Sequence, residues 1–207
     1  GEPALASMLD DGERIVAALG VPPHRVVAFG RSLGSLYAIE LARRLPTLGG
    51  LVLDSGIAAL SELWPLRDLA AAMGCTPGEV DGAIATLFDH RVKLAGYRGP
   101  LLVLHAAGDR LVLPSHAQRL RDWAGGGDTS LVVFPRGDHN SIFMANHDRY
   151  VAIVADFLRR TGITGPDPDA ADVAPGTVRP TGSNRSPPPP AMARVASSEP
   201  PLRWRDA

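Results

Sequence analysis

The stretch Phe29-Gly30-Arg31-Ser32-Leu33-Gly34-Ser35 decides the fold of this chain. An apolar run at 25–29 leads into it and predicts a buried strand. The pattern at 35–44 follows it and predicts a helix. A Gly-x-Ser-x-Gly sequence at a strand-to-helix turn is the context in which a nucleophilic serine is found. The sequence therefore predicts that Ser32 is a nucleophile.

The predicted turn also explains the residues around Ser32. Because Ser32 would stand at the amino end of a helix, the backbone N–H of Leu33 and the helix dipole can stabilise a developing negative charge. We expect a side chain at either Gly30 or Gly34 to collide with neighbouring backbone. The simpler interpretation is an ordinary strand–helix turn in which the serine has no chemical role.

Length and composition restrict the remaining possibilities. The 207 residues suffice for one domain with a core, and a formal net charge of −1 argues against nucleic acid as the main partner. The single cysteine, Cys75, excludes an internal disulfide and a zinc site built from cysteines. We find neither a signal peptide nor an apolar run of the roughly 18 residues that span a membrane. A cytoplasmic location is the default, not an inference, since residue 1 is Gly rather than Met.

Strands alternate with helices along 1–163. The patterns predict further helices at 4–19, 115–124 and 148–160 and further strands at 51–53, 101–104 and 131–134. This alternation is typical of an α/β fold, with a mainly parallel sheet and helices on both faces. Residues 57–98 are interpreted as a small helical insertion or lid. An ordinary connection that packs on the sheet is the alternative.

The spacing of apolar residues predicts the buried face of each helix. The expected stripes of the first and last helices are Met8, Ile15, Val16 and Leu19, and Val151, Val154, Ala155 and Leu158. Those of the insertion are Leu66, Leu69, Ala70 and Met73, and Val80, Ile84, Leu87 and Phe88. Capping boxes at Thr76-Pro77-Gly78-Glu79 and Ser115-His116-Ala117-Gln118 predict where two helices begin.

The composition changes from about residue 164 onward. Ten of the 19 prolines of the chain lie in 164–207, and large apolar residues become few. Such a segment cannot bury enough apolar surface to offset its ordering entropy. We therefore predict a domain at 1–163 and a disordered, proline-rich tail at 164–207.

Candidate partners of Ser32 follow two later strands. A serine hydroxyl needs an adjacent base, usually a histidine, and a carboxylate fixes the tautomer of that histidine. In an open parallel sheet such groups gather at the carboxyl ends of the strands. Asp109 follows Leu104 by five residues, and His139 follows Phe134 by five residues. We therefore predict Ser32, Asp109 and His139 as a catalytic triad.

Other residues compete for these roles. Asp54 also follows a strand and is the rival acid, whereas the side chain of Asp138, adjacent to His139, is expected to point elsewhere. His105 is expected to make a structural hydrogen bond. The remaining histidines are expected at the surface: His24, His90, His116 and His147. Taken singly, Asp109 could be a turn-forming residue and His139 a loop histidine.

Residues 25–160 resemble the C-terminal part of an α/β-hydrolase. The resemblance is carried by Gly30-Arg31-Ser32-Leu33-Gly34-Ser35, by Leu51-Val52-Leu53-Asp54-Ser55-Gly56, by 102–114 and by Gly137-Asp138-His139-Asn140. These motifs are similar to those of the serine aminopeptidase-like and BEM46-like hydrolases, whose superfamily has the order Ser…Asp…His. The resemblance implies an esterase, thioesterase or peptidase that acts on a small-molecule acyl substrate through an acyl-enzyme. It implies no metal or organic cofactor.

The front of the chain departs from that family. An α/β-hydrolase normally has four strands before the serine turn, but only 31 residues precede Ser32 here. The loop that supplies the second oxyanion N–H in the family has no counterpart, so Leu33 is the one donor identified. A second hypothesis is therefore a catalytically impaired or non-catalytic, hydrolase-derived interaction module. The strand at 25–29 would also pair only with 51–53, and such an exposed edge favours self-association.

Overall fold

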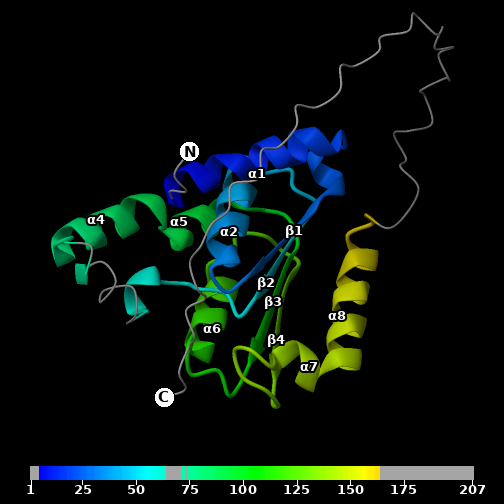
Figure 1. Cartoon of the computed structure of the whole chain (residues 1–207). Coiled ribbons are helices and arrows are strands. Elements are labelled where there is room, and N and C mark those ends of the chain that lie inside the picture. The colour runs from blue at the N-terminus through cyan, green and yellow to red at the C-terminus, as the bar shows by residue number, and fades with distance from the viewer. Residues whose placement is uncertain (1–4, 64–70, 73, 164–207) are drawn as a thin grey trace, which may run out of the picture. The chain divides into compact units, whose positions relative to one another are not determined.

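Four parallel strands form the sheet of the computed structural model, which describes residues 5–63, 71–72 and 74–163 (Figure 1). They are β1 (Val27–Arg31), β2 (Gly50–Asp54), β3 (Leu101–Ala106) and β4 (Thr129–Phe134), in the order β1-β2-β3-β4. Every neighbouring pair is parallel, which confirms the predicted sheet. All described residues belong to one unit, Gly1–Pro166.

All four strands differ from their predicted bounds. β2 extends one residue further at each end, and β4 begins two residues earlier. A 3-10 turn, η1 (Pro23–Arg25), occupies the start expected for β1, so this strand begins at Val27 and continues through Gly30 and Arg31. β3 is longer than predicted because His105 and Ala106 still pair with β4. His105 is therefore a strand residue, and the turn that holds Asp109 is shorter than expected.

Helices cover both faces of the sheet (Figure 1). The helices are α1 (Leu5–Leu19), α2 (Gly34–Arg44), α4 (Pro77–Leu87), α5 (His90–Gly96), α6 (Pro114–Asp122), α7 (Ile142–Ala145) and α8 (His147–Arg160). On one face α2, α5 and α6 pack against Leu51 and Leu53 of β2. On the other face α8 packs against Val52 of the same strand. This alternation along β2 is what a strand buried on both faces requires.

The buried stripe predicted for α1 is partly wrong. Val16 is buried as expected, but Ile15 and Leu19 are 61% and 57% exposed, and Leu9 is buried instead. The reason is that α1 packs against α2, where Gly12 approaches the side chain of Leu41. The face of α1 that carries Ile15 and Leu19 points away from this contact and stays exposed. The side chain of Met8 lies outside the described part of the structure.

The buried face of α8 is also rotated from the prediction. Tyr150 and Phe157 are buried against the sheet, whereas Val151 and Ala155 are exposed. Of the predicted stripe, Val154 and Leu158 are half-buried. Tyr150 is polar at its tip and was not counted as a core residue. Its hydroxyl has a buried acceptor, which allows the ring to pack inward.

The two predicted capping boxes have different outcomes. At α4 the side chain of Thr76 accepts the N–H of Glu79 and the Glu79 carboxylate accepts the N–H of Thr76, which confirms the first box. The second is wrong, since α6 already begins at Pro114 and has no side-chain cap. Proline lacks an N–H and has a helical φ, so it occupies the first helical position and places Ser115 inside the helix.

The structure describes part of 57–98. In the second predicted stripe Phe88 is buried, and Val80, Ile84 and Leu87 are half-buried. The first stripe (Leu66, Leu69, Ala70 and Met73) lies outside the described residues, as do the predicted tail and the boundary before it. That this segment forms a lid stays a prediction.

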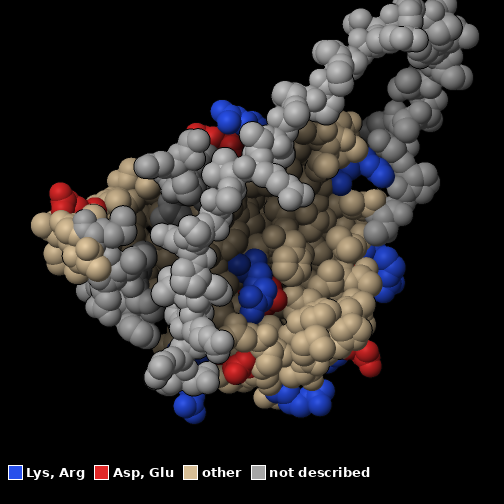
Figure 2. Space-filling view, in the orientation of Figure 1, with Lys and Arg blue, Asp and Glu red and all other residues tan. Residues whose placement is uncertain are grey.

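The described surface carries its charges in small groups. On the face in Figure 2, a few Lys, Arg, Asp and Glu side chains gather near the centre of a hollow, amid mostly uncharged residues.

None of the described helices is both long enough and apolar enough to cross a bilayer. Among the described strands, β1 has β2 as its one neighbour and so forms an edge of the sheet, as expected.

Candidate functional site

Ser32 stands in a strained turn between β1 and α2. Its φ is +50°, in the left-handed region that a non-glycine residue rarely adopts. Hydrogen bonds hold the turn on both sides: the Ser32 N–H donates to the Asp54 carbonyl at 2.9 Å, and the Ser32 carbonyl accepts the Ser35 N–H at 3.0 Å. The Ser35 hydroxyl donates to the same carbonyl at 2.6 Å. The strained conformation is therefore fixed by β2 and by the first turn of α2.

The two glycines of the turn are not equivalent. A Cβ at Gly30 would lie 2.7 Å from the Ala38 Cβ and 2.7 Å from the Gly34 carbonyl oxygen, as expected for a crowded turn. A Cβ at Gly34 would meet nothing within 4 Å. The predicted collision at Gly34 is therefore wrong. Gly34 is the first residue of α2, where its Cβ would point into open space.

Ser32, His139 and Asp109 form one continuous hydrogen-bonded chain. The Ser32 Oγ lies 2.9 Å from Nε2 of His139, and Nδ1 of His139 lies 2.8 Å from Oδ2 of Asp109. An ionised carboxylate can only accept, so Nδ1 of His139 carries the proton and Nε2 is free to accept from the serine hydroxyl. Asp109 and His139 are buried, and Ser32 is half-buried. This is the arrangement in which a histidine can deprotonate a serine.

Turns after β3 and β4 place the two partners of Ser32. Oδ1 of Asp109 accepts the backbone N–H groups of Leu111 and Val112, each at 2.9 Å. Asp109 is therefore a turn-forming residue and a partner of His139 at once, through different oxygens. Oδ1 of Asp138 accepts the N–H groups of Asn140 and Ser141, so this carboxylate points into its own turn, as expected.

The rival acid Asp54 has other partners. Its Oδ2 accepts the Tyr150 hydroxyl at 2.8 Å and lies 3.8 Å from Nε of Arg31, while its Oδ1 accepts the Ser55 hydroxyl at 2.9 Å. Burial, and then the nearby Asp54 charge, raise the pKa of the Tyr150 hydroxyl. No hydrogen bond joins Asp54 to His139 in the described part of the chain. The carboxylate paired with His139 is that of Asp109.

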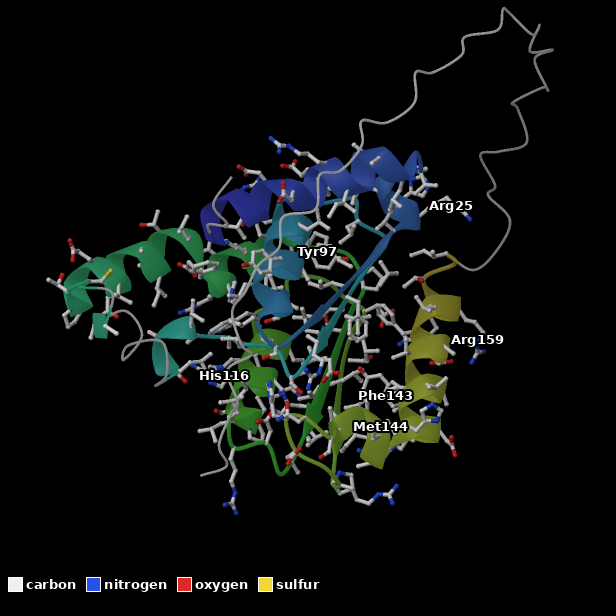
Figure 3. The ribbon with its side chains drawn as sticks, viewed as in Figure 1. Arg25, Tyr97, His116, Phe143, Met144 and Arg159 are labelled. Atoms are coloured by element: carbon white, nitrogen blue, oxygen red, sulfur yellow. The ribbon has the colours of Figure 1, made fainter. Side chains whose placement is uncertain are left out.

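Two histidines predicted at the surface are buried. His116 is 2% exposed, and its Nδ1 accepts the N–H of Ala58 at 3.0 Å, which ties α6 to the segment after β2 (Figure 3). His90 is 1% exposed and packs edge-on against Phe88. Each lies four residues before a buried leucine of its helix, Leu120 or Leu94, a spacing that could have shown both to be on buried faces. His24 and His147 are exposed, as expected.

Burial also changes the acidity of the two unexpected histidines. It lowers the pKa of His116 and lowers the pKa of His90 to about 4, with repulsion from Lys93 as a further cause at His90. Neither ring nitrogen of His90 has a hydrogen-bond partner in the described structure. His105 makes the structural hydrogen bond that was predicted, from Nε2 to the Val112 carbonyl at 2.8 Å, and so supports the turn around Asp109.

Leu33 occupies the position expected of an oxyanion donor. It follows Ser32 directly, has a helical backbone (φ −55°, ψ −30°) and caps α2. Among the described residues, no group of three or more His, Cys, Asp or Glu side chains is arranged to hold a metal ion.

Comparisons with known proteins bear on the fold. No protein-family model matches the sequence, and no curated protein matches it. Solved structures do match. A monoacylglycerol lipase of Paleococcus ferrophilus has a TM-score of 0.61 and 19% identity over 78% of this chain and 77% of that one.

Two further structures agree with that match. A hydrolase of Pseudomonas aeruginosa has a TM-score of 0.58 and 22% identity over 76% of this chain and 73% of its own. An α/β fold family hydrolase of Bacillus anthracis has a TM-score of 0.55 and 15% identity over 75% of this chain and 74% of its own. At these identities the similarity shows the fold, which is that of the α/β-hydrolases.

Proposed function

We propose that this chain, which has the α/β-hydrolase fold, is a serine hydrolase that cleaves an ester, thioester or amide through an acyl-enzyme. The observation that carries the proposal is the hydrogen-bonded chain from Ser32 Oγ through His139 to Asp109, with distances of 2.9 and 2.8 Å. Three of the matching structures, a lipase, a hydrolase and an esterase domain, support the same class of activity.

Acylation begins with attack of the Ser32 Oγ on the acyl carbon. Nε2 of His139 takes the hydroxyl proton as the new carbon–oxygen bond forms, and the Asp109 carboxylate stabilises the resulting imidazolium. The negative charge on the former carbonyl oxygen is stabilised by the N–H of Leu33 and the amino end of α2. When the tetrahedral intermediate collapses, His139 returns its proton to the leaving alcohol, thiol or amine.

Deacylation repeats the same steps with water. Nε2 of His139 removes a proton from water as the oxygen attacks the acyl carbon, and the proton then passes to Ser32 as the acid product departs. Asp109 keeps the imidazole in one tautomer throughout. The turn around Asp109 contributes because Leu111 and Val112 fix the carboxylate from behind.

Turnover of a panel of p-nitrophenyl esters, from acetate to octanoate, tests the proposal. We expect hydrolysis by the purified protein and a loss of kcat of about 10^4- to 10^6-fold in Ser32→Ala, the range found when a triad nucleophile is removed. Ser130→Ala is the matched control, because Ser130 lies near the start of β4, at the opposite end of the strand from the turn that holds His139. A folded protein that hydrolyses none of the esters would instead favour the non-catalytic interaction module.

A further inference from the structure

A second polar network reaches the backbone of His139, whereas the triad contacts its ring. The guanidinium of Arg31 donates a hydrogen bond to the backbone carbonyl of His139. Nε of the same side chain lies 3.8 Å from Oδ2 of Asp54, which in turn accepts the Tyr150 hydroxyl at 2.8 Å. The network thus runs from α8 through the ends of β2 and β1 to the turn after β4.

The sheet itself brings Arg31 and Asp54 together. They are the last residues of β1 and β2 and lie opposite each other in the parallel register. Because side chains alternate along a strand, Arg31 lies on the same face as Val27, which packs with the α8 side of the core. The same face of β1 therefore carries Arg31 toward the helix that holds Tyr150.

The burial of Asp54 explains why this carboxylate requires the other members of the network. Asp54 is 2% exposed, and a buried carboxylate is stable only when it is paired and hydrogen-bonded. Tyr150 and Ser55 supply hydroxyl donors, and Arg31 supplies the compensating charge. The guanidinium carries several donors in a fixed plane, so it can face Asp54 and still donate to the His139 carbonyl.

His139 is consequently fixed at three points. Its two ring nitrogens contact Ser32 and Asp109, and its carbonyl oxygen contacts Arg31. The ring contacts orient the imidazole, whereas the carbonyl contact sets where the backbone of its loop lies. Arg31 also precedes Ser32 directly, so one residue links the backbone positions of the nucleophile and of its base.

We infer that Arg31 is a positioning residue that holds His139 in register with Ser32, and that Asp54 and Tyr150 hold the Arg31 guanidinium in place. This inference rests on the proposed function. It assigns to the former rival acid, Asp54, a role in geometry and none in proton transfer.

Steady-state kinetics separate this role from a purely structural one. In Arg31→Gln we expect kcat to fall roughly 10- to 100-fold, the cost of displacing a catalytic group by about 1 Å, while KM changes little. Arg31→Lys should recover part of the loss, because lysine keeps a positive charge opposite Asp54 and is longer than glutamine, so its ammonium can still donate to the carbonyl of His139. Asp54→Asn added to Arg31→Gln should lower kcat no further, since both act through one network.

Two tyrosine variants test the same network with a smaller change, in case Arg31→Gln fails to fold. Tyr150→Phe removes only a hydroxyl and should lower kcat by about 3- to 10-fold if it acts through Asp54 and Arg31. Tyr97→Phe is its matched control: Tyr97 is also buried, and its hydroxyl donates to the carbonyls of Leu48 and Pro100 at the other end of the strands (Figure 3). Tyr97→Phe should leave kcat unchanged.

NMR of the His139 ring distinguishes failure of this inference from failure of the proposed function. We expect the ring signals of His139 to shift or broaden in Arg31→Gln and Tyr150→Phe but not in Tyr97→Phe, whether or not the protein hydrolyses any ester. Unchanged ring signals with an unchanged kcat, or a rise in KM alone, would overturn the positioning role. If the wild type hydrolyses no ester, the proposed function fails, and the ring signals of His139 alone show whether Arg31 positions it.

Discussion

Oδ2 of Asp109 lies 2.8 Å from Nδ1 of His139. The other oxygen of this carboxylate accepts two backbone N–H groups of its own turn. The carboxylate is therefore fixed before the imidazole contacts it, and it can select one tautomer of His139. Asp54, after the neighbouring strand, is as buried but is engaged by Tyr150 and Ser55.

Asp109→Asn should abolish most turnover. The amide can present an N–H to Nδ1, which favours the wrong tautomer, and in serine triads this substitution lowers kcat by about 10^4-fold. His139→Ala should be similarly severe. Asp54→Asn should cost far less, because Asp54 acts only on position. Ester hydrolysis by the three variants, with their melting temperatures, checks this order; a more damaging Asp54→Asn would show that the acid is misassigned.

Gly30→Ala should be strongly destabilising and Gly34→Ala should not. The new Cβ at Gly30 would lie under 3.0 Å from backbone atoms of α2, and forced overpacking typically costs about 1–3 kcal/mol. At Gly34 the methyl group enters open space. Urea unfolding of the two variants makes the comparison. Equal stabilities would contradict the close approach of β1 to α2.

Buried His90 should make stability fall between pH 7 and pH 5. Its pKa is lowered to about 4 in the folded protein, whereas an unfolded histidine titrates near about 6.5. Between these values only the unfolded state binds the proton, so this contribution is fully present above pH 6.5 and is lost as the pH falls toward 4. The loss from pH 7 to pH 5 is about 2 kcal/mol.

His90→Leu should remove that part of the pH dependence. Glu40, whose charge also acts on His90, does not interfere. Although burial would raise its pKa, hydrogen bonds from Arg43, Lys93 and Arg44 lower the pKa of Glu40 to about 2, so its contribution is lost only at lower pH. The lowered pKa of His116 leaves a slope common to both proteins. Urea unfolding at pH 5 and pH 7 tests this, with His147→Gln as an exposed control. An unchanged pH dependence in His90→Leu would refute it.

The edge strand β1 should mediate self-association. Phe29 is half exposed on this strand, and no lysine or proline interrupts Val27 to Phe29 at the edge. Phe29→Lys should lower the apparent mass in sedimentation velocity at high protein concentration. Val133→Lys, on the other edge strand β4, is the matched control. A wild-type protein that stays monomeric at every concentration would exclude this association.

Short-range patterns predict the sheet, which the structure confirms, and they predict the candidate triad, whose three side chains lie within hydrogen-bonding distance. Apolar runs marked the strands, and fixed spacings after them marked Asp109 and His139. These patterns could not reveal contacts between side chains distant in the sequence. The Tyr150–Asp54 bond and the Arg31 contact to His139 require the register of β1 with β2 and the packing of α8.

Errors in the predictions have a common cause as well. The apolar spacing predicts Ile15 and Leu19 in the core, but α1 buries Leu9 and Val16 instead and leaves these two residues exposed. His90 and His116 are expected at the surface because they lie in the insertion and in a helix, away from the ends of the strands. Their buried positions follow from helix periodicity, since each lies four residues before a buried leucine, Leu94 or Leu120.

Labelling with a fluorophosphonate tests the central claim, that Ser32 is a nucleophile activated by His139, most directly. We expect one label per molecule, located on Ser32 by mass spectrometry, absent in Ser32→Ala and greatly slowed in His139→Ala. Label that persists in Ser32→Ala, or a folded wild-type protein that takes up none, would contradict it.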